Sequence, residues 1–446
     1  MFYLSLMKGF IIDQQTLRDL NVFSETSGSV FNIFKRTRTL GGREKLREMM
    51  SNPSTDINLL TRRSEAIRYF FDREIQLDIR NEELDLIEFY LKSTRRRSKG
   101  NLIDAVSDYV TRNSSNDYYI IKTGLKYLIK LVKYLNLFIT ENRPENLPEY
   151  LNVIFNRITE LTAEGQLSQA LKLNESNLKF YQVSWLDDAF RGSEKQNIQE
   201  LLQLVYELDV LEYVGFTAKN RGFSFPGYIS GPGMHFSVGS LFHPGIKNPV
   251  ANDVRFDGGL NMAFLTGSNM AGKSSLLKSL GLAIYLAHIG FPVPAKAMKT
   301  TIFNGLVTTI NLPDNISDGL SHYYSEVKRV KDVALKLTEN DRLFVVFDEL
   351  FRGTNVKDAF DASLMIISEL SHIRNSAFFI STHIVELADE LQKYPNISFQ
   401  QMETFFENDK PVFTYKLSKG ISTERLGMYI VLNEGIIDTI RKAAKT

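Results

Sequence analysis

The fold of this chain is decided by the stretch Gly267-Ser268-Asn269-Met270-Ala271-Gly272-Lys273-Ser274, which Ser275 follows directly. The stretch fits the phosphate-binding pattern G-x-x-x-x-G-K-S/T without a gap. The apolar run Ala263-Phe264-Leu265 before it is typical of a buried strand, and Leu276 and Leu280 after it lie at helix spacing. A strand, a glycine-rich loop and a helix in this order predict a nucleotide-binding site. The alternative is a glycine- and serine-rich turn that matches the pattern by chance.

The residue types of this stretch suit phosphate chemistry. Gly267 and Gly272 allow the backbone to turn tightly, so that successive N–H groups point at one phosphate. The N-terminus of the following helix adds a partial positive charge. We expect Lys273 to reach the β- and γ-phosphates of ATP and the Ser274 hydroxyl to bind Mg²⁺. The sequence therefore predicts an ATP site formed by residues 267–275.

Composition places the chain among soluble globular proteins. Its 446 residues are enough for two or three domains, and its apolar content of 43% and charged content of 24% are ordinary. The absence of cysteine excludes disulfides, thiolate zinc sites and cysteine nucleophiles. Residues 1–8 lack the basic start of a signal peptide, and no apolar run approaches the roughly 20 residues of a membrane span. We therefore expect a cytoplasmic protein without membrane contact.

Charge gives a weaker indication about nucleic acid. The chain carries 53 basic and 52 acidic residues, a net charge of +1, whereas nucleic-acid-binding proteins usually have a basic excess or a basic patch. The basic runs Lys35-Arg36-Thr37-Arg38 and Arg95-Arg96-Arg97-Ser98-Lys99 are candidates for phosphate contacts, and solvated helix ends are the alternative. Any contact with DNA must come from such local clusters.

The first half of the sequence has the periodicity of helices. Asp13 and Asp56 stand where they can cap helices. Apolar residues at steps of three and four predict helices over 118–141, through 151–161 and from about 193.

Near residue 215 this pattern changes to closely spaced glycines with short strands and turns, so we place the domain boundary at about 220–230. We predict an α + α/β fold in which residues 1–225 form a helical lever domain and residues 226–446 an α/β domain.

A second apolar run in the α/β domain ends in two carboxylates. The run Leu343-Phe344-Val345-Val346-Phe347-Asp348-Glu349 has the Walker B pattern of a buried strand followed by Asp-Glu. We expect Asp348 to hold Mg²⁺ opposite Ser274, and Glu349 to polarise the water that attacks the γ-phosphate. Together with the loop around Lys273, these carboxylates predict ATP hydrolysis.

Two further residues are candidates for the γ-phosphate. His383 ends a third apolar run, Ala377–Ser381 followed by Thr382, and can sense the phosphate or position water; a structural histidine is the alternative. Ser321 follows Gly319 at the start of a predicted helix. It either caps its own helix or, with the N–H groups there, receives the γ-phosphate of a nucleotide held by a second subunit.

Taken together, these motifs resemble those of the MutS family of DNA mismatch repair ATPases. Residues 266–275 look like the family's TGPNMGGKST loop, whose Asn269-Met270 pair separates it from most other P-loop proteins. Phe291-Pro292-Val293-Pro294-Ala295 resembles the YVPA segment. Asp348-Glu349 with Arg352-Gly353-Thr354 resembles the DEIGRGT motif, and Ser381-Thr382-His383 resembles the ATH motif.

The resemblance extends beyond these motifs. Leu320-Ser321 with Glu326 corresponds to the signature GRST segment and its glutamate, and Gly427 with 436–440 resembles the closing helices. Upstream, 12–20 and 39–46 look like the start of the family's core lever domain. The resemblance is strong over 240–440 and faint over 10–220.

This resemblance implies an ABC-type ATPase domain that works as a dimer. Each nucleotide, with Mg²⁺, would lie between one subunit's P-loop and Ser321 of the partner subunit. Residues from about 420 to 446 would form a short helical dimerisation segment. ATP binding and hydrolysis would open and close the helical levers around DNA.

The sequence also departs from the family's pattern. The chain begins where the family's lever domain begins, so we expect neither the mismatch-reading nor the connector domain, and an absent or reduced clamp between about 150 and 195. Leu320 replaces a signature arginine, and Pro249-Val250 stands where many relatives have an aromatic residue that stacks on adenine. We expect ATPase chemistry without direct reading of mismatches.

The function favoured by these observations is Mg²⁺-dependent ATP hydrolysis coupled to lever movement of a homodimer on duplex or branched DNA. It would serve mismatch repair or related DNA processing, with a repair protein as a further partner. The alternative is a nucleotide-switched scaffold that recruits a protein without binding DNA, which the net charge of +1 favours. A third reading, another ABC-type ATPase of chromosome maintenance, conflicts with the Asn269-Met270 pair and the missing coiled-coil heptads.

Overall fold

The computed structural model describes residues 9–24, 28–94, 97, 106, 116–231, 233–256, 259–310, 322–407, 410–422 and 431–444. The chain divides into two compact units. The sheet unit comprises Met1–Asn32, Asn52–Thr61 and Asn220–Thr446, and the helical unit comprises Ile33–Ser51 and Arg62–Lys219. The chain therefore combines an all-helical unit with a unit of mixed helix and sheet. Among the described residues, no helix is long and apolar enough to cross a membrane.

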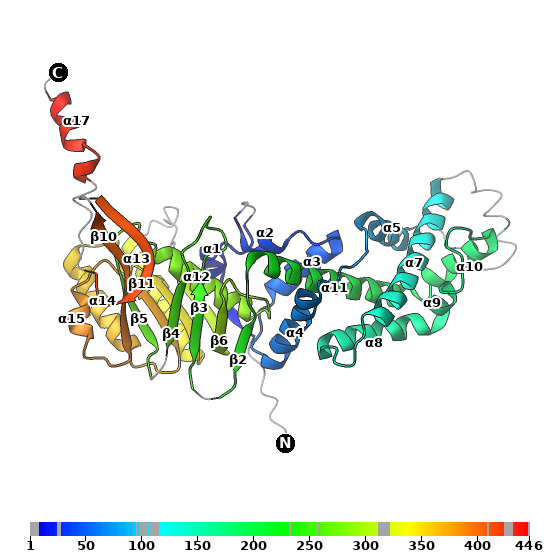
Figure 1. Ribbon diagram of the computed structural model, residues 1–446, viewed down its shortest axis with the longest axis horizontal. Coiled ribbons are helices and arrows are strands. Elements are labelled where there is room, and N and C mark those ends of the chain that lie inside the picture. The colour runs from blue at the N-terminus through cyan, green and yellow to red at the C-terminus, as the bar shows by residue number, and fades with distance from the viewer. Residues whose placement is uncertain are drawn as a thin grey trace. The chain divides into compact units, whose positions relative to one another are not determined.

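The sheet unit is built on a seven-stranded sheet (Figure 1). The strands lie in the order β1 (Ile11–Ile12), β7 (Gly305–Thr309), β8 (Leu343–Asp348), β9 (Ala377–Ser381), β5 (Met262–Thr266), β10 (Ile397–Glu407) and β11 (Lys410–Lys419). All neighbours are parallel except β10 and β11. Every residue of β5, β7, β8 and β9 is buried, as expected of parallel strands covered on both faces. The predicted strands before Gly267, before Glu349 and before Thr382 are thus confirmed.

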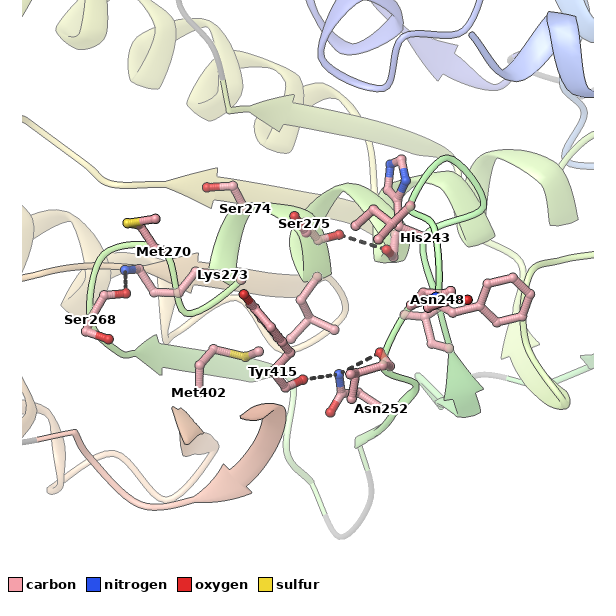
Figure 2. A pocket seen from close by; sticks show the side chains of 18 of the residues that line it. His243, Asn248, Asn252, Ser268, Met270, Lys273, Ser274, Ser275, Met402 and Tyr415 are labelled. Carbon is pink, nitrogen blue, oxygen red and sulfur yellow. Dashed lines mark hydrogen bonds between the residues drawn. The ribbon is translucent and has the colours of Figure 1, made fainter. Parts of the chain in front are cut away.

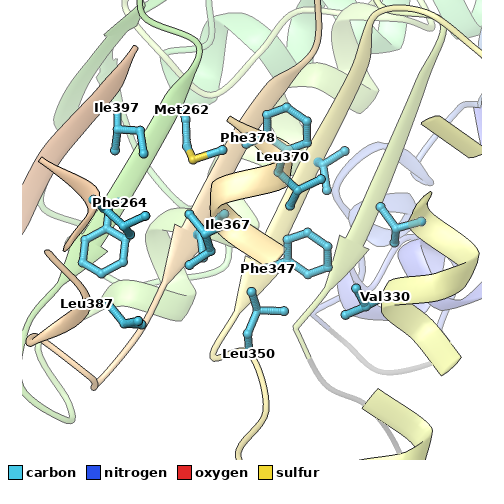
Figure 3. Packing of buried hydrophobic residues seen from close by; sticks show 14 of the residues in the cluster. Met262, Phe264, Val330, Phe347, Leu350, Ile367, Leu370, Phe378, Leu387 and Ile397 are labelled. Atoms are coloured by element: carbon cyan, nitrogen blue, oxygen red, sulfur yellow. The ribbon is translucent and has the colours of Figure 1, made fainter. Parts of the chain in front are cut away.

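Helices complete the sheet unit. They are α1 (Gln14–Asp19), α12 (Lys273–Ala287), α13 (His322–Glu339), α14 (Val356–Leu370), α15 (Leu387–Leu391) and α17 (Ile436–Ala443). In the apolar core of this unit, Phe264, Phe347 and Phe378 of the strands pack with Ile367 of α14 and Val330 of α13 (Figure 3). Burial of each such side chain contributes roughly 1.5–3 kcal/mol. This packing fixes the strand ends at which the polar residues gather.

A second sheet of four strands packs on the first. Its order is β2 (Pro226–Ile229), β6 (Ala297–Thr301), β3 (Phe236–Leu241) and β4 (Asn252–Phe256). The ring of Phe236 lies 5.3 Å from that of Phe344, and the ring of Phe256 stacks on Phe379 at 4.8 Å. These aromatic contacts between the two sheets place β4 in the same compact unit as the loop after β5.

The helical unit contains α3 (Leu40–Ser51), α5 (Asn81–Lys92), α7 (Asn116–Glu141), α8 (Glu149–Ala163), α9 (Gly165–Ala170) and α10 (Phe180–Phe190). It also contains α4 (Ile57–Arg73) from Arg62 and α11 (Lys195–Arg221) as far as Lys219. The helix α2 (Val30–Phe34) leads into this unit from the sheet unit. Helices predicted over 118–141, through 151–161 and from about 193 are confirmed as α7, α8 and α11. Asp56 caps α4 through hydrogen bonds from Asn58 N and Leu59 N, as the sequence predicts.

The start of α3 shows how the helical unit buries a charge. Asp209 of α11 is buried and accepts hydrogen bonds from the N–H groups of Arg38 and Thr39, each 2.9 Å long, and from the Thr39 hydroxyl at 2.7 Å. Burial raises the pKa of Asp209, although these hydrogen bonds oppose the rise. A Cβ at Gly42 would lie 2.2 Å from the Asp209 carboxylate, so glycine permits this close approach.

The first described residues belong to the sheet, although the sequence suggests only helix there. β1 pairs in parallel with β7, with Ile11 opposite Gly305. Asp13 then caps α1, because its carboxylate accepts the N–H of Thr16 at 2.8 Å. The predicted cap is therefore confirmed, and a two-residue strand precedes it.

Candidate functional site

The loop between β5 and α12 has the backbone geometry of an anion cradle. Gly267 and Gly272 have φ values of +146° and +101°, in the region that favours glycine. Met270 also has a positive φ of +70°, and its side chain is 72% exposed. Gly272 occupies the N-cap position of α12 without a side-chain cap, so this helix start keeps backbone donors for a ligand.

Lys273, the first residue of α12, lies inside this loop. Its buried ammonium donates hydrogen bonds to Gly267 O at 2.8 Å and to Ser268 O at 3.2 Å. Burial lowers the pKa of Lys273, and the charges of Glu349 and Asp348 oppose the fall. A phosphate oxygen can take the place of either carbonyl without moving the ammonium out of the loop.

A cavity of about 580 Å³, the main cavity, opens beside the loop (Figure 2). Its volume lies within the roughly 300–1,000 Å³ of typical small-molecule sites. One part of the wall comes from the loop and α12, and another from the segment before β4 together with the hairpin β10–β11. The predicted site residues that line it are Ser268, Asn269, Met270, Gly272, Lys273, Ser274, Ser275 and Glu349. Gly267 and Ala271 belong to the same loop.

Both carboxylates stand at the end of β8, beside the end of β9. Asp348 ends β8 and is buried, and its carboxylate accepts a hydrogen bond from the Ser381 hydroxyl at the end of β9. The backbone then turns away, because Glu349 has a positive φ of +63° while its N–H still donates to Ser381 O at 3.1 Å. This turn directs Glu349 to the main cavity, where it shares the wall with Lys273.

Two basic side chains hold the Glu349 carboxylate. His383 Nε2 contacts one carboxylate oxygen, and Arg352 Nη1 lies 3.4 Å from the other. Burial alone would raise the pKa of Glu349, but the hydrogen bond from His383 and the charges of His383, Arg352 and Lys273 hold it below its usual value. Glu349 is therefore an ionised acceptor at neutral pH. The sequence pattern predicts that His383 senses the γ-phosphate or positions water. In the structure, His383 also contacts Glu349.

Residues outside the sequence motifs also line the main cavity. They include His243, Asn252, Met402 and Tyr415 (Figure 2). Asn252 of β4 donates to Tyr415 O at 2.9 Å and accepts from Leu417 N at 2.7 Å, which fixes β11 where Tyr415 has a φ of +57°. These contacts join residues more than 150 positions apart, and no local pattern signals them. Pro249 and Val250, where the sequence lacks the expected aromatic residue, lie in the same wall.

Magnesium would find only part of its ligand set in the protein. Within the ranges that the structure describes, no three histidine, aspartate or glutamate side chains gather into a metal site. Ser274 and Asp348 offer oxygen ligands, and Mg²⁺ in nucleotide sites takes the remainder from phosphate and water. Ser321, the residue predicted to act in trans, and Gly427 lie outside the described residues.

Comparison with known proteins covers both units. The family profile described as MutS domain III matches residues 15–317, and that of MutS domain V matches residues 263–446. The DNA mismatch repair protein MutS of Leuconostoc citreum is 30% identical over 302 residues, 63% of this chain and 34% of that protein. The proteins of the same name from Lactococcus lactis subsp. cremoris and Thermosipho melanesiensis are each 26% identical. They match 298 and 320 residues, 64% and 69% of this chain and 34% and 38% of those proteins.

The extent of these matches decides the family. The chain spans little more than a third of the length of these curated relatives. The domain III profile nevertheless covers more than half of the 446 residues, and the domain V profile includes the loop around Lys273 and both carboxylates. This chain belongs to the MutS family.

Proposed function

We propose that this chain is an ATPase of the P-loop, ABC-type class and that ATP with Mg²⁺ occupies the main cavity. The observation that carries the proposal is that Lys273 and Glu349 line one cavity. Lys273 comes with the loop after β5, and Glu349 follows β8. ATP hydrolysis requires a cation that binds phosphate and a carboxylate that orients the attacking water, both beside the same ligand. Family membership supports the same chemistry.

Each site residue has a role in this proposal. The N–H groups at the start of α12 and the ammonium of Lys273 bind the β- and γ-phosphates. Ser274 and Asp348 bind Mg²⁺, which would neutralise charge on the phosphates. Glu349 orients the attacking water, and His383 holds the Glu349 carboxylate in place through the contact between them.

The part of the main cavity away from the loop suits a flat base. Pro249 and Val250 supply apolar wall there, and Met402 and Tyr415 supply apolar wall against Gly267 and Gly272 of the loop. Both ends of the Asn252 amide already bind the backbone of β11, so this side chain holds the wall instead of reading the edge of the base. We therefore propose that adenine is held chiefly by apolar contact in the part of the cavity lined by Pro249 and Val250.

A homodimer formed through the sheet unit is part of the proposal. The short helix α17 exposes Ile436, Ile437 and Ile440, and Leu432 just before it is exposed as well. Apolar side chains gathered in this way favour cover by another surface, and a second copy of the chain supplies one. Residues from about 420 to 446 would thus be the dimerisation segment. Ser321 of the partner subunit would complete each nucleotide site.

We further propose that ATP binding and hydrolysis move the helical unit as a lever on DNA, in mismatch repair or related DNA processing. Membership of the MutS family supports this role, and the relatives named above are DNA mismatch repair proteins. The second candidate is a nucleotide-switched scaffold that recruits a protein without DNA. The net charge of +1 favours it, because it leaves no overall attraction to phosphate.

Two measurements on the purified chain test these proposals. ATP hydrolysis is followed in Mg²⁺ and after removal of Mg²⁺ with a chelator, and we expect turnover only with Mg²⁺. Binding to matched, mismatched and branched DNA is then measured over a salt series with and without ATP. A phosphate interface loses affinity steeply as salt rises. Absence of turnover contradicts the ATPase, and absence of DNA binding at low salt favours the scaffold.

A further inference from the structure

One face of the short helix α1 is bound to the end of β7. Asp13, Thr16 and Asp19 are spaced by three residues and therefore lie on one side of the helix. Thr308 N donates to Thr16 Oγ1 at 3.0 Å. Asp19 Oδ2 accepts from the Thr308 hydroxyl at 2.7 Å and from Ile310 N at 2.9 Å. The backbone that leaves the strand is thus held by α1.

Arg329 of α13 binds the same place from another side. It is buried, and its guanidinium donates to Thr308 O at 2.7 Å, to Thr309 Oγ1 at 3.3 Å and to Asp13 Oδ2 at 2.6 Å. Lys336 also contacts the Asp13 carboxylate. Burial would raise the pKa of Asp13, but hydrogen bonds from Arg329 and Lys336 hold it well below its usual range. Asp13 consequently stays charged and keeps Arg329 in this position.

The end of β7 forms part of the wall beside the carboxylates. Thr309 and Ile310 line a small cavity of about 10 Å³ together with Glu326, Asp348, Glu349, Leu350, Phe351, Arg352 and Val330. This volume is about that needed by a single water molecule. Its size depends on where Thr309 and Ile310 stand. Arg329 binds the Thr309 hydroxyl, and Asp19 of α1 binds the N–H of Ile310.

We propose that Asp19 and Arg329 are positioning residues for ATP hydrolysis, which hold Thr309 and Ile310 against the carboxylate side of the site. The inference rests on the proposed ATPase function. No residue of α1 and neither Thr309 nor Ile310 is among the described residues that line the main cavity. Loss of these contacts should therefore slow hydrolysis and leave nucleotide affinity unchanged.

The test compares Asp19→Ala and Arg329→Lys with Gln14→Ala, a change on the exposed side of α1. Asp19→Ala removes the oxygen that binds Thr308 and Ile310, and Arg329→Lys keeps the charge beside Asp13 but loses the forked donors. The full-length variants are assayed for affinity with a fluorescent ATP analogue, for single-turnover hydrolysis and for thermal unfolding. We expect hydrolysis to fall by about tenfold to a hundredfold in both variants, with affinity within about twofold of wild type. Gln14→Ala should match wild type.

Met298→Ala, which truncates a buried side chain of β6, shows what destabilisation alone does. A purely structural role of Asp19 and Arg329 would lower the melting temperature as Met298→Ala does and leave the hydrolysis rate of the folded protein unchanged. That outcome overturns the inference, and so does a loss of affinity equal to the loss of rate. A wild-type chain that binds ATP analogue but never hydrolyses ATP overturns the proposed function instead.

Discussion

The helical unit and the candidate site of the sheet unit hold charged side chains in different ways. In the helical unit, Asp209 accepts three hydrogen bonds from residues before α3, and Asp187 pairs with Arg191 where both side chains are buried. In the sheet unit, Lys273 and Glu349 have partners as well, but both face a cavity of about 580 Å³. The partners of Lys273 are loop carbonyls, which a ligand can replace. A charged side chain therefore marks a ligand site only where space for a ligand adjoins it.

The largest effect should follow from removing the ammonium group of Lys273 in the sheet unit. Lys273→Ala takes away the ammonium within the loop, and we expect affinity for ATP to fall about a hundredfold or more, since charged hydrogen bonds to phosphate are lost. Titration with a fluorescent ATP analogue measures this. Lys299→Ala, which removes an exposed lysine of β6, is the matched control. Unchanged affinity in Lys273→Ala would remove this residue from the site.

Removing the negative charge of Glu349 in the sheet unit should slow turnover without preventing ATP binding. Glu349→Gln keeps the size of the side chain but removes its negative charge, and we expect hydrolysis to slow by about a hundredfold while ATP still binds. Single-turnover hydrolysis and analogue binding are measured on the same preparation. Glu390→Gln, an exposed change in α15, controls for charge. Turnover at the wild-type rate would show that another group orients the water.

Removing the buried anion of the helical unit should affect stability alone. Asp209→Ala leaves the N–H groups of Arg38 and Thr39 without their acceptor, and we expect a loss of about 2–4 kcal/mol in the free energy of unfolding. Urea denaturation measures the loss, with Glu145→Ala as an exposed control. The affinity for ATP of folded protein should be unchanged. A large fall in affinity would contradict the division of roles between the units.

The smallest effect concerns a buried side chain that stays neutral. His288 is fully buried, donates from Nδ1 to Ile284 O and accepts from Phe303 N, and burial lowers its pKa from 6.5 to about 4. The unfolded chain binds a proton at His288 more readily than the folded chain does. The contribution of neutral His288 to the free energy of unfolding is therefore complete above pH 6.5 and is lost as pH falls toward 4. At pH 5 the loss is on the order of 2 kcal/mol. His288→Gln should show a shallower pH dependence of unfolding over this range, and an identical slope would contradict the assignment.

Local patterns were enough to predict the parts of the site that lie along one segment. The run before Glu349 is apolar because β8 is buried on both faces, and its polar end reaches the edge of the sheet. The same reasoning predicts the loop before Lys273. The loop pattern predicts a tight backbone turn at Gly267 and Gly272, and both glycines have the positive φ values that such a turn requires.

Other features depend on contacts that no local pattern reveals. β1 has only two residues, which are too few for a periodicity, and its partner β7 is almost three hundred residues away. The bond between Asn252 and the backbone at Tyr415 joins two sheets, and the contact between Glu349 and His383 joins two strand ends. The Gly41-Gly42 pair lies inside α3, where Gly42 makes room for Asp209 of α11.

The division of the chain into units has a consequence for synthesis on the ribosome. Four boundaries separate segments of the two units, after Asn32, Ser51, Thr61 and Lys219. At about 5–20 residues per second, Ile11 is made about 15–60 s before its partner Gly305. The described helices of the helical unit have all been made by then, because α11 ends at Arg221. We expect the nascent chain to form these helices before the seven-stranded sheet, so Ile11 and Ile12 lack their strand partner during this interval and are expected sites of chaperone binding during translation.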